Sequence, residues 1–316
     1  MGNKHKKNII KKTVFELKKS SKLSSSIYYG FELKDGRICL CICGSSFYIY
    51  NINNIQEGKE DITIDVGYSV SSVELHNGHL VIVTYGPDMI FYSLEGNTYK
   101  EVQRISAKNE GCRENFVSQL LNGQLITMDW FGRIKLYNLI DGFYKEIKCF
   151  QPMDTFQASK MKEIKENLII LKGWNHSNEN FKLPLYLCDL NQEKAKLIKD
   201  DCIDFDIYDI HSIIIFNKNS IELFNIDKFK VISEMICAPS IAITSGCLYN
   251  NKIVLIGCKS EELIGFKINK NKIIEIGRTK ILSNLNHRVS GILKLKNNSF
   301  IAIGDTEIYV FNPIKS

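Results

Sequence analysis

The stretch KDGRICLCICGSSFYIYNI (34–52) recurs twice without a gap, as HNGHLVIVTYGPDMIFYSL (76–94) and LNGQLITMDWFGRIKLYNL (121–139). Each copy begins with a β-prone run, continues through a turn, and ends with a second β-prone run that closes on an aromatic, a polar and an aliphatic residue. A repeated pair of strands at a fixed spacing predicts a repeat architecture in place of a single irregular core.

Four looser copies follow, at 166–190, 210–226, 250–268 and 297–313. One residue closes the second strand of each of the seven copies, at spacings of 36 to 51 residues: Tyr50, Tyr92, Tyr137, Cys188, Phe224, Phe266 and Phe311. Further β-prone runs precede and follow the copies, among them VSSVEL (70–75) and TYKEVQRI (98–105). Four short strands per 40–45 residues is the pattern of propeller blades, so we predict an all-β, seven-bladed β-propeller of four-stranded antiparallel blades.

The last copy ends too close to Ser316 to supply its own fourth strand. The β-prone run TVFEL (13–17) precedes the first copy and has no place in it. We therefore expect this run to pair as the outer strand of the last blade, which closes the ring and leaves no broken edge. The predicted organisation is a flexible basic arm (1–12) and one propeller (13–316).

The blade endings FGRIKLY (131–137), KNSIELF (218–224) and DTEIYVF (305–311) resemble the ending D-G-T-I-K-hydrophobic-W of WD40-like propellers. The closing Trp of that family is replaced here by Tyr or Phe in six blades and by Cys188 in the fourth. The chain thus resembles a degenerate WD40-like seven-bladed propeller over nearly its whole length. The resemblance implies a protein-interaction scaffold.

Cys39, Cys41 and Cys43 alternate along the first copy, which raises the question of a metal site. In the ungapped alignment they fall in columns of apolar residues. Alternate residues on a strand lie about 6.6 Å apart, whereas thiolates that share a zinc ion each lie about 2.3 Å from it. No C-x-x-C motif occurs in the chain. We expect a packed core strand, because a free cysteine behaves as a small hydrophobic residue, and we predict neither a metal nor a cofactor.

The net charge of +6 is concentrated at one end of the chain. Residues 1–22 hold eight lysines against the single acidic residue Glu16, and the remaining residues hold 33 basic and 34 acidic side chains. A neutral body disfavours a protein built to grip nucleic acid. Weak contact of the arm with a membrane or another acidic surface is an alternative role that stays open, and its lysines are Lys4, Lys6, Lys7, Lys11 and Lys12. With no signal peptide visible, we expect a cytoplasmic or nuclear protein, monomeric on its own.

Sequence motifs for catalysis are absent: the chain has no G-x-S-x-G, no phosphate-binding loop and no H-E-x-x-H. We therefore predict a protein that is not an enzyme. An active site at the mouth of the central channel stays open as the alternative, and converging carboxylates or histidines would favour it.

Binding residues of such a scaffold are expected on loops that the rigid blades present. In the resembled family, the loops between the second and third strands and the loops between blades share one face. By position, the predicted protein-binding residues on that face are Tyr68, Arg113, Trp130, Phe131, Trp174, His176, His287 and Arg288. Trp130 is equally well explained by packing between blades, and Trp174 is placed in a long loop of the fourth blade. We predict that a protein or peptide binds here, since Trp, Tyr and Arg contribute most to interface energies.

Overall fold

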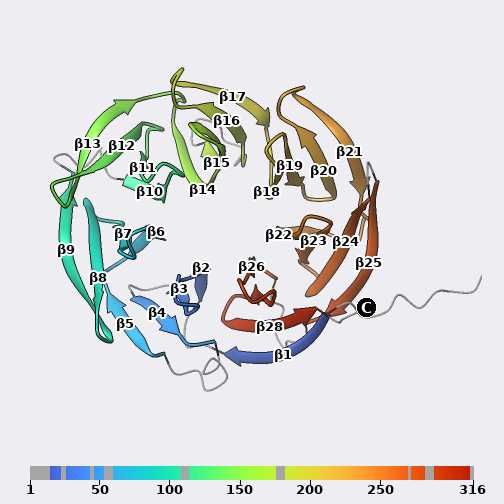
Figure 1. Ribbon diagram of the computed structural model, residues 1–316. Helices are drawn as coiled ribbons and strands as arrows, with labels where there is room; N and C mark the ends of the chain where they lie inside the picture. The colour runs from blue at the N-terminus through green and yellow to red at the C-terminus, as the bar shows by residue number, and fades with distance from the viewer. Residues whose placement is uncertain are drawn as a thin grey trace, which may run out of the picture.

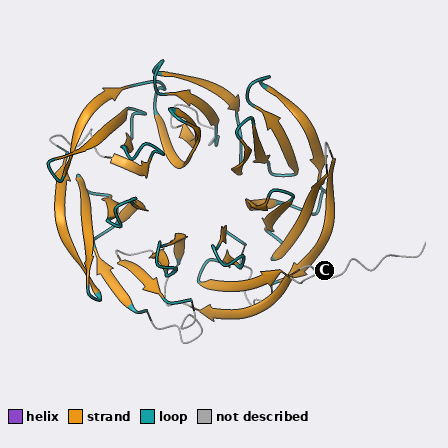
Figure 2. Cartoon of the chain, in the orientation of Figure 1, coloured by secondary structure: helices purple, strands orange, loops and turns teal. Residues whose placement is uncertain are grey.

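The computed structural model is built of strands and turns throughout the residues that it describes, which are 15–22, 26–42, 46–52, 60–107, 114–175, 182–269, 272–281 and 288–313 (Figure 2). These residues form 28 strands in seven four-stranded antiparallel sheets. The sheets stand as blades around a central axis, so that the first strand of each blade lies innermost (Figure 1). The predicted seven-bladed β-propeller is confirmed. Within these residues, no helix is long and apolar enough to cross a membrane.

Blades 1 to 4 follow one another along the chain. Blade 1 contains β2 (Ile27–Glu32), β3 (Ile38–Ile42), β4 (Ser46–Tyr50) and β5 (Ile62–Asp65). Blade 2 contains β6 (Ser69–Glu74), β7 (Leu80–Thr84), β8 (Asp88–Glu95) and β9 (Thr98–Ser106). Blade 3 contains β10 (Glu114–Gln119), β11 (Leu125–Asp129), β12 (Ile134–Ile140) and β13 (Phe143–Phe150). Blade 4 contains β14 (Phe156–Lys165), β15 (Leu168–Asn175), β16 (Leu185–Asp189) and β17 (Lys194–Lys199).

Blades 5 to 7 complete the ring. Blade 5 contains β18 (Asp204–Asp209), β19 (Ser212–Phe216), β20 (Ser220–Asn225) and β21 (Lys230–Ile236). Blade 6 contains β22 (Ile243–Asn250), β23 (Ile253–Cys258), β24 (Glu262–Asn269) and β25 (Lys272–Lys280). Blade 7 contains β26 (Gly291–Lys294), β27 (Phe300–Ile303), β28 (Glu307–Pro313) and, from the start of the chain, β1 (Phe15–Lys22).

The pairing of β1 with β28 closes the ring as predicted. It runs antiparallel from Phe15 opposite Pro313 to Lys22 opposite Glu307. The strand differs in its bounds from the predicted 13–17, because it continues to Lys22, and positions 13 and 14 lie outside the described residues together with the predicted arm 1–12. The prediction ended this strand too early because residues 18–22 are polar and show no hydrophobic pattern. They still form a strand because pairing with β28 uses the backbone alone.

The hydrophobic core lies between the blades, in seven clusters that each join two neighbours. The residue that closes the second strand of each copy faces the preceding blade, and each of the seven junctions receives one of them: Tyr50, Tyr92, Tyr137, Cys188, Phe224, Phe266 and Phe311. All seven are buried. The apolar side chains buried at every junction between blades stabilise the ring.

Cys39 and Cys41 are fully buried in the core between blades 1 and 2, which confirms the packed strand. The expectation for the third position, Cys43, falls outside the described residues. Strand β3 ends at Ile42, and Cys43 lies outside the described residues. Its counterpart in blade 2, Tyr85, is 55% exposed in a turn. The apolar column of the alignment therefore ends in surface aromatic residues, because the strands are one residue shorter than the alternating pattern.

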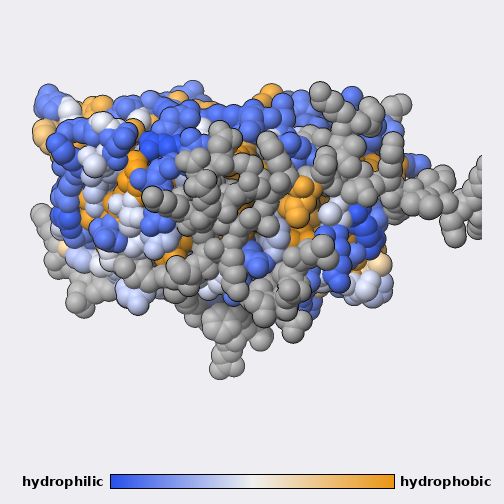
Figure 3. All heavy atoms as spheres, turned by 90° about the horizontal axis from the view of Figure 1, so that it is seen from below, coloured by the Kyte–Doolittle hydropathy of each residue, from blue (hydrophilic) through white to orange (hydrophobic). Residues whose placement is uncertain are grey.

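Two faces of the ring follow from this topology. On the upper face lie the turns between the second and third strands and the loops that join blades. The lower face holds the turns between the first and second strands and those between the third and fourth. Figure 3 shows the side wall, where hydrophobic patches alternate with hydrophilic ones; Leu17 on β1 and Val102 on β9 are among the exposed apolar residues of the outer strands.

Hydrogen bonds between neighbouring blades recur on the lower face. The backbone N–H of Lys34 donates to the carboxylate of Glu74 at 2.6 Å, and that of Lys296 donates to Glu32 at 2.8 Å. Equivalent bonds join blade 2 to Gln119 and blade 3 to Glu163. Each bond fixes a turn of one blade to the innermost strand of the next.

Candidate functional site

The turn between β11 and β12 on the upper face is built around one buried carboxylate. The Asp129 side chain is fully buried. Its Oδ1 accepts hydrogen bonds from the backbone N–H groups of Phe131 at 2.9 Å and Arg133 at 3.0 Å. Its Oδ2 accepts from Nε of Arg133 at 2.5 Å. Bonds to an ionised acceptor are stronger than neutral ones, so Asp129 holds the intervening residues in one conformation.

The loop between β13 and β14 also packs against the tip of this turn. Gly132 has φ 81°, in the left-handed region, and a Cβ there would lie 2.7 Å from the carbonyl oxygen of Met153. Nε2 of Gln151 donates to the carbonyl oxygen of Phe131 at 3.0 Å. The turn therefore packs against the loop to blade 4, and only glycine fits at position 132.

Four aromatic residues of blades 2 and 3 gather on the upper face, and we call them the aromatic surface: Tyr68, Tyr85, Trp130 and Phe131. The rings of Tyr85 and Trp130 meet edge to face, with centroids 6.2 Å apart. The backbone N–H of Tyr85 donates to the carbonyl oxygen of Tyr68 at 2.5 Å. Tyr68 is 65% exposed and Phe131 is 47% exposed. Edge-to-face aromatic pairs are favourable, so this contact stabilises the relative position of the two rings.

Trp130 packs between blades, which was one of the two explanations offered for it. Its ring contacts Tyr85 of the neighbouring blade, as inter-blade packing requires, and it stays partly exposed beside Phe131. Tyr85 was missed by sequence reasoning, although it occupies the same alignment column as Trp130. Two large aromatic residues directly after the second strand of consecutive blades were the available signal.

Trp174 is not in a loop as predicted, since it belongs to strand β15 and pairs with Gln157 of β14. The second strand of blade 4 is longer than its counterparts, which places the ring at the rim of the upper face, 40% exposed. The loop between blades 3 and 4 is bonded to the end of this strand, because Oγ1 of Thr155 donates to Oδ1 of Asn175 at 3.3 Å. Trp174 thus shares a face with the aromatic surface on the neighbouring blade.

The remaining predicted residues are not brought together with this surface. Arg288 is exposed at the junction of blades 6 and 7, with blade 1 between it and blade 2. Arg113, His176 and His287 lie outside the described residues. The structure thus groups Tyr68, Trp130 and Phe131, adds Tyr85, and separates Arg288.

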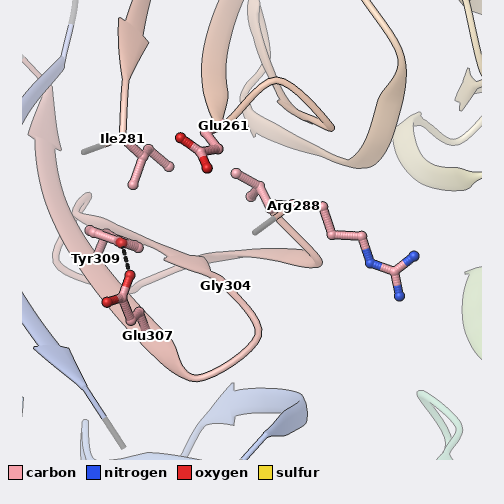
Figure 4. Close-up of a pocket in the computed structure, with 7 residues that line it drawn as sticks. Glu261, Ile281, Arg288, Gly304, Glu307 and Tyr309 are labelled. Carbon is pink, nitrogen blue, oxygen red and sulfur yellow. Dashed lines mark hydrogen bonds between the residues drawn. The ribbon is translucent and has the colours of Figure 1, made fainter. Parts of the chain in front are cut away.

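A small pocket lies beside Arg288 on the upper face (Figure 4). Its walls come from blades 6 and 7: Glu261, Ile281, Arg288, Val289, Gly304, Glu307 and Tyr309. The hydroxyl of Tyr309 donates to the carboxylate of Glu307, and the guanidinium group of Arg288 points away from both carboxylates.

A charged pair is buried within blade 3. Nζ of Lys135 donates to Oε1 of Glu114 at 2.5 Å, and both side chains are largely buried. Burial raises the pKa of Glu114, and the ammonium group of Lys135 opposes that rise. A close ion pair of this kind neutralises its members, which suits a structural role.

The fold has close counterparts among solved structures. The structure titled "Structure of U3-55K" superposes with a TM-score of 0.71, covering 93% of this chain and 98% of that one at 9% sequence identity. That titled "Crystal structure of RRP9 WD40 repeats" has a TM-score of 0.72, covering 95% and 99% at 9% identity. The chain has the same fold as these WD40-repeat propellers. No protein-family model and no curated protein sequence matches it. At this identity the likeness concerns the fold alone.

The cysteines in the part of the chain that the structure describes are free thiols. Of the eight that lie in the described residues, seven are buried and Cys149 is exposed. Burial raises the pKa of Cys188 to about 12 and that of Cys202 to about 12, which keeps these thiols protonated at neutral pH. Within the same residues, no group of three or more His, Cys, Asp or Glu side chains is placed to hold a metal ion.

Proposed function

We propose that this WD40-like propeller is a non-catalytic scaffold that binds a protein or a peptide through the aromatic surface of blades 2 and 3. The observation that carries the proposal is the exposed pair Tyr85 and Phe131 flanking Trp130, on a turn that buried Asp129 holds in place. Aromatic residues of this type are enriched among the residues that dominate interface energies.

Rigidity of the turn adds to the argument. A binding surface that is already ordered loses little conformational entropy when a partner docks. The three hydrogen bonds to Asp129 and the close approach of Gly132 to Met153 order the tip in the free protein. Trp174 on blade 4 extends the exposed aromatic area along the same rim, so an extended peptide crossing blades 2 to 4 fits the arrangement best.

The test is affinity capture of the tagged protein from its own cell extract, compared between two double variants. Tyr85→Ala/Phe131→Ala removes two exposed rings of the aromatic surface. Leu139→Ala/Phe143→Ala is the matched control, since both residues are 52% exposed and lie at the lower end of blade 3. We expect the first variant to lose a partner that the wild type and the control retain. Loss of the same partner from both variants, or from neither, would rule out this surface as the binding site.

A further inference from the structure

The aromatic surface is formed by turns and loops, which limits how a peptide can bind to it. Tyr68 lies in the loop that joins blades 1 and 2, Tyr85 in the turn after β7, and Trp130 and Phe131 in the turn after β11. None of these four residues belongs to a strand, so they offer no strand edge with which a peptide backbone could pair. A peptide bound here must therefore be recognised by the side chains.

The aromatic surface also offers hydrogen-bond donors. Tyr68 is 65% exposed and Tyr85 is 55% exposed. In the part of the chain that the structure describes, neither of their hydroxyl groups has a hydrogen-bond partner. A phenol hydroxyl group can donate to a carbonyl oxygen. The surface can thus contact the apolar groups of a peptide and also donate hydrogen bonds to its backbone carbonyl groups.

A polyproline II helix has the chemistry that this surface matches. It forms no internal hydrogen bonds, so its carbonyl oxygens remain available as acceptors, and its prolines dock on aromatic side chains. It rises about 3.1 Å per residue, so about two residues cover the 6.2 Å between the ring centroids of Tyr85 and Trp130. Its conformation is formed before binding, as is that of the turn that Asp129 orders, so little conformational entropy is lost on association.

The charged side chains beside Tyr85 and Phe131 are paired with one another. Asp88 pairs with Arg104 at 2.5 Å, and Asp129 pairs with Arg133 at 2.5 Å. The guanidinium group of Arg133 also lies 5.6 Å from the centre of the Phe131 ring. Because these charges are neutralised within blades 2 and 3, the centre of the surface favours an uncharged segment.

Two exposed carboxylates flank the surface, one on each side. Asp65 lies at the upper end of β5 in blade 1, shortly before Tyr68. Asp154 lies in the loop between blades 3 and 4, next to Met153, whose carbonyl oxygen approaches Gly132. Within the described residues, neither carboxylate forms an ion pair with a basic side chain. A basic residue on each side of the bound segment is therefore complementary in charge.

We propose that the partner of the aromatic surface is a proline-rich segment in the polyproline II conformation, with a basic residue at each end. This inference rests on the proposed function, because it names the partner of the same surface. The prolines lie over the rings of blades 2 and 3, and Tyr68 and Tyr85 donate to carbonyl oxygens of the segment. The basic side chains at its ends pair with Asp65 and Asp154.

The test is isothermal titration calorimetry of the purified full chain with synthetic peptides. The first peptide is a run of about eight prolines between two lysines, which is roughly 25 Å long as a polyproline II helix. A second peptide has alternating glycine and serine in place of the prolines, and a third has glutamates in place of the lysines. The hydroxyl variant is Tyr68→Phe/Tyr85→Phe, which keeps both rings. The matched control is Tyr99→Phe/Tyr208→Phe, at partly buried tyrosines in the lower halves of blades 2 and 5.

We expect the lysine-flanked proline peptide to bind, and the glycine–serine peptide to bind at least about tenfold more weakly because it must be ordered on binding. One hydrogen bond contributes roughly fivefold to affinity, so the hydroxyl variant should bind the proline peptide about 25-fold more weakly than the wild type. The control variant should stay within about twofold of the wild type. The glutamate-flanked peptide should bind more weakly than the lysine-flanked one, by a factor that shrinks as salt rises.

Absence of binding of the proline peptide, equal binding of the glycine–serine or glutamate-flanked peptide, or equal affinities of the hydroxyl and control variants would overturn the inference. The capture experiment separates its failure from that of the proposed function. A partner that is captured through Tyr85 and Phe131 but has no proline-rich segment overturns this inference alone, whereas capture of the same partners by Tyr85→Ala/Phe131→Ala overturns both.

Discussion

Substitution of Asp129 tests whether the tip of the aromatic surface is held by the contacts described for it. Asp129→Ala removes the acceptor of two backbone N–H groups and of the Arg133 guanidinium group. A hydrogen bond to a charged group contributes about 1.5–3 kcal/mol, and the lower end applies at a surface turn that water can reach, so the two N–H bonds together amount to about 3 kcal/mol. Arg133 is 30% exposed, and its pair with Asp129 adds up to about 1 kcal/mol. We expect a loss of about 4 kcal/mol.

Asp129→Asn separates these contributions. Its Oδ1 can still accept from both N–H groups, while the charge that attracts Arg133 is gone, so we expect a loss of only about 1–2 kcal/mol. Asp141→Asn is the matched control, since the side chain of Asp141 is 84% exposed in another turn of blade 3 and Asn tolerates its positive φ of 53°.

The assay is urea unfolding followed by tryptophan fluorescence in a Trp174→Phe background, in which Trp130 is the sole tryptophan. The ring of Trp130 lies next to the substituted residue, so its emission reports the turn as well as the global transition. Equal midpoints for the Ala and Asn variants, or a loss below about 1 kcal/mol for Asp129→Ala, would show that the carboxylate does not order this turn.

Two further predictions concern the blades themselves. Gly173→Ala would place a Cβ 1.9 Å from the carbonyl oxygen of Gln157, so we expect the melting temperature to fall by roughly 5–10 °C. In the control variant Gly291→Ala the nearest atom would be 3.7 Å from the new Cβ, so the melting temperature should change by no more than about 2 °C. Similar changes in the two variants would refute the packing of β14 on β15. Asp204 accepts from Lys160 across blades 4 and 5 at 2.6 Å. Burial alone would raise the pKa of Asp204, but the charges of Lys160 and Lys172, together with the hydrogen bonds from Lys160 and the backbone N–H of Gly246, outweigh burial, so the pKa lies below its ordinary value. A lowered pKa stabilises the fold above the unfolded pKa of about 4 and loses this effect as pH falls further, so thermal stability of the wild type should drop more steeply in acid than that of Asp204→Asn; parallel curves would contradict the pairing.

The repeat pattern was sufficient to predict the blades, their number and the closure of the ring. The prediction succeeded because a propeller buries the same positions in every blade. Tyr50 and Phe311, although far apart in sequence, therefore occupy equivalent buried positions between blades. A cysteine can occupy this position as well, since Cys188 is the equivalent buried residue between blades 3 and 4.

The candidate site was only partly predictable. Tyr85 lies in the same alignment column as Cys43, which the alternating pattern assigned to the core, because that pattern runs one residue beyond the end of β7. Asp129 gave no signal, since its role depends on the turn that it closes.

The most direct measurement is site-specific photo-crosslinking in the native cell, with a benzophenone side chain placed at Phe131 in one variant and at Phe143 in another. The two residues are 47% and 52% exposed, at the upper and lower ends of the same blade. Binding at the aromatic surface predicts a discrete crosslinked protein for the probe at position 131 and none of that mass for the probe at 143. A crosslink to the same protein from position 143 alone, or from neither position while that protein is still captured, would contradict the proposed binding site.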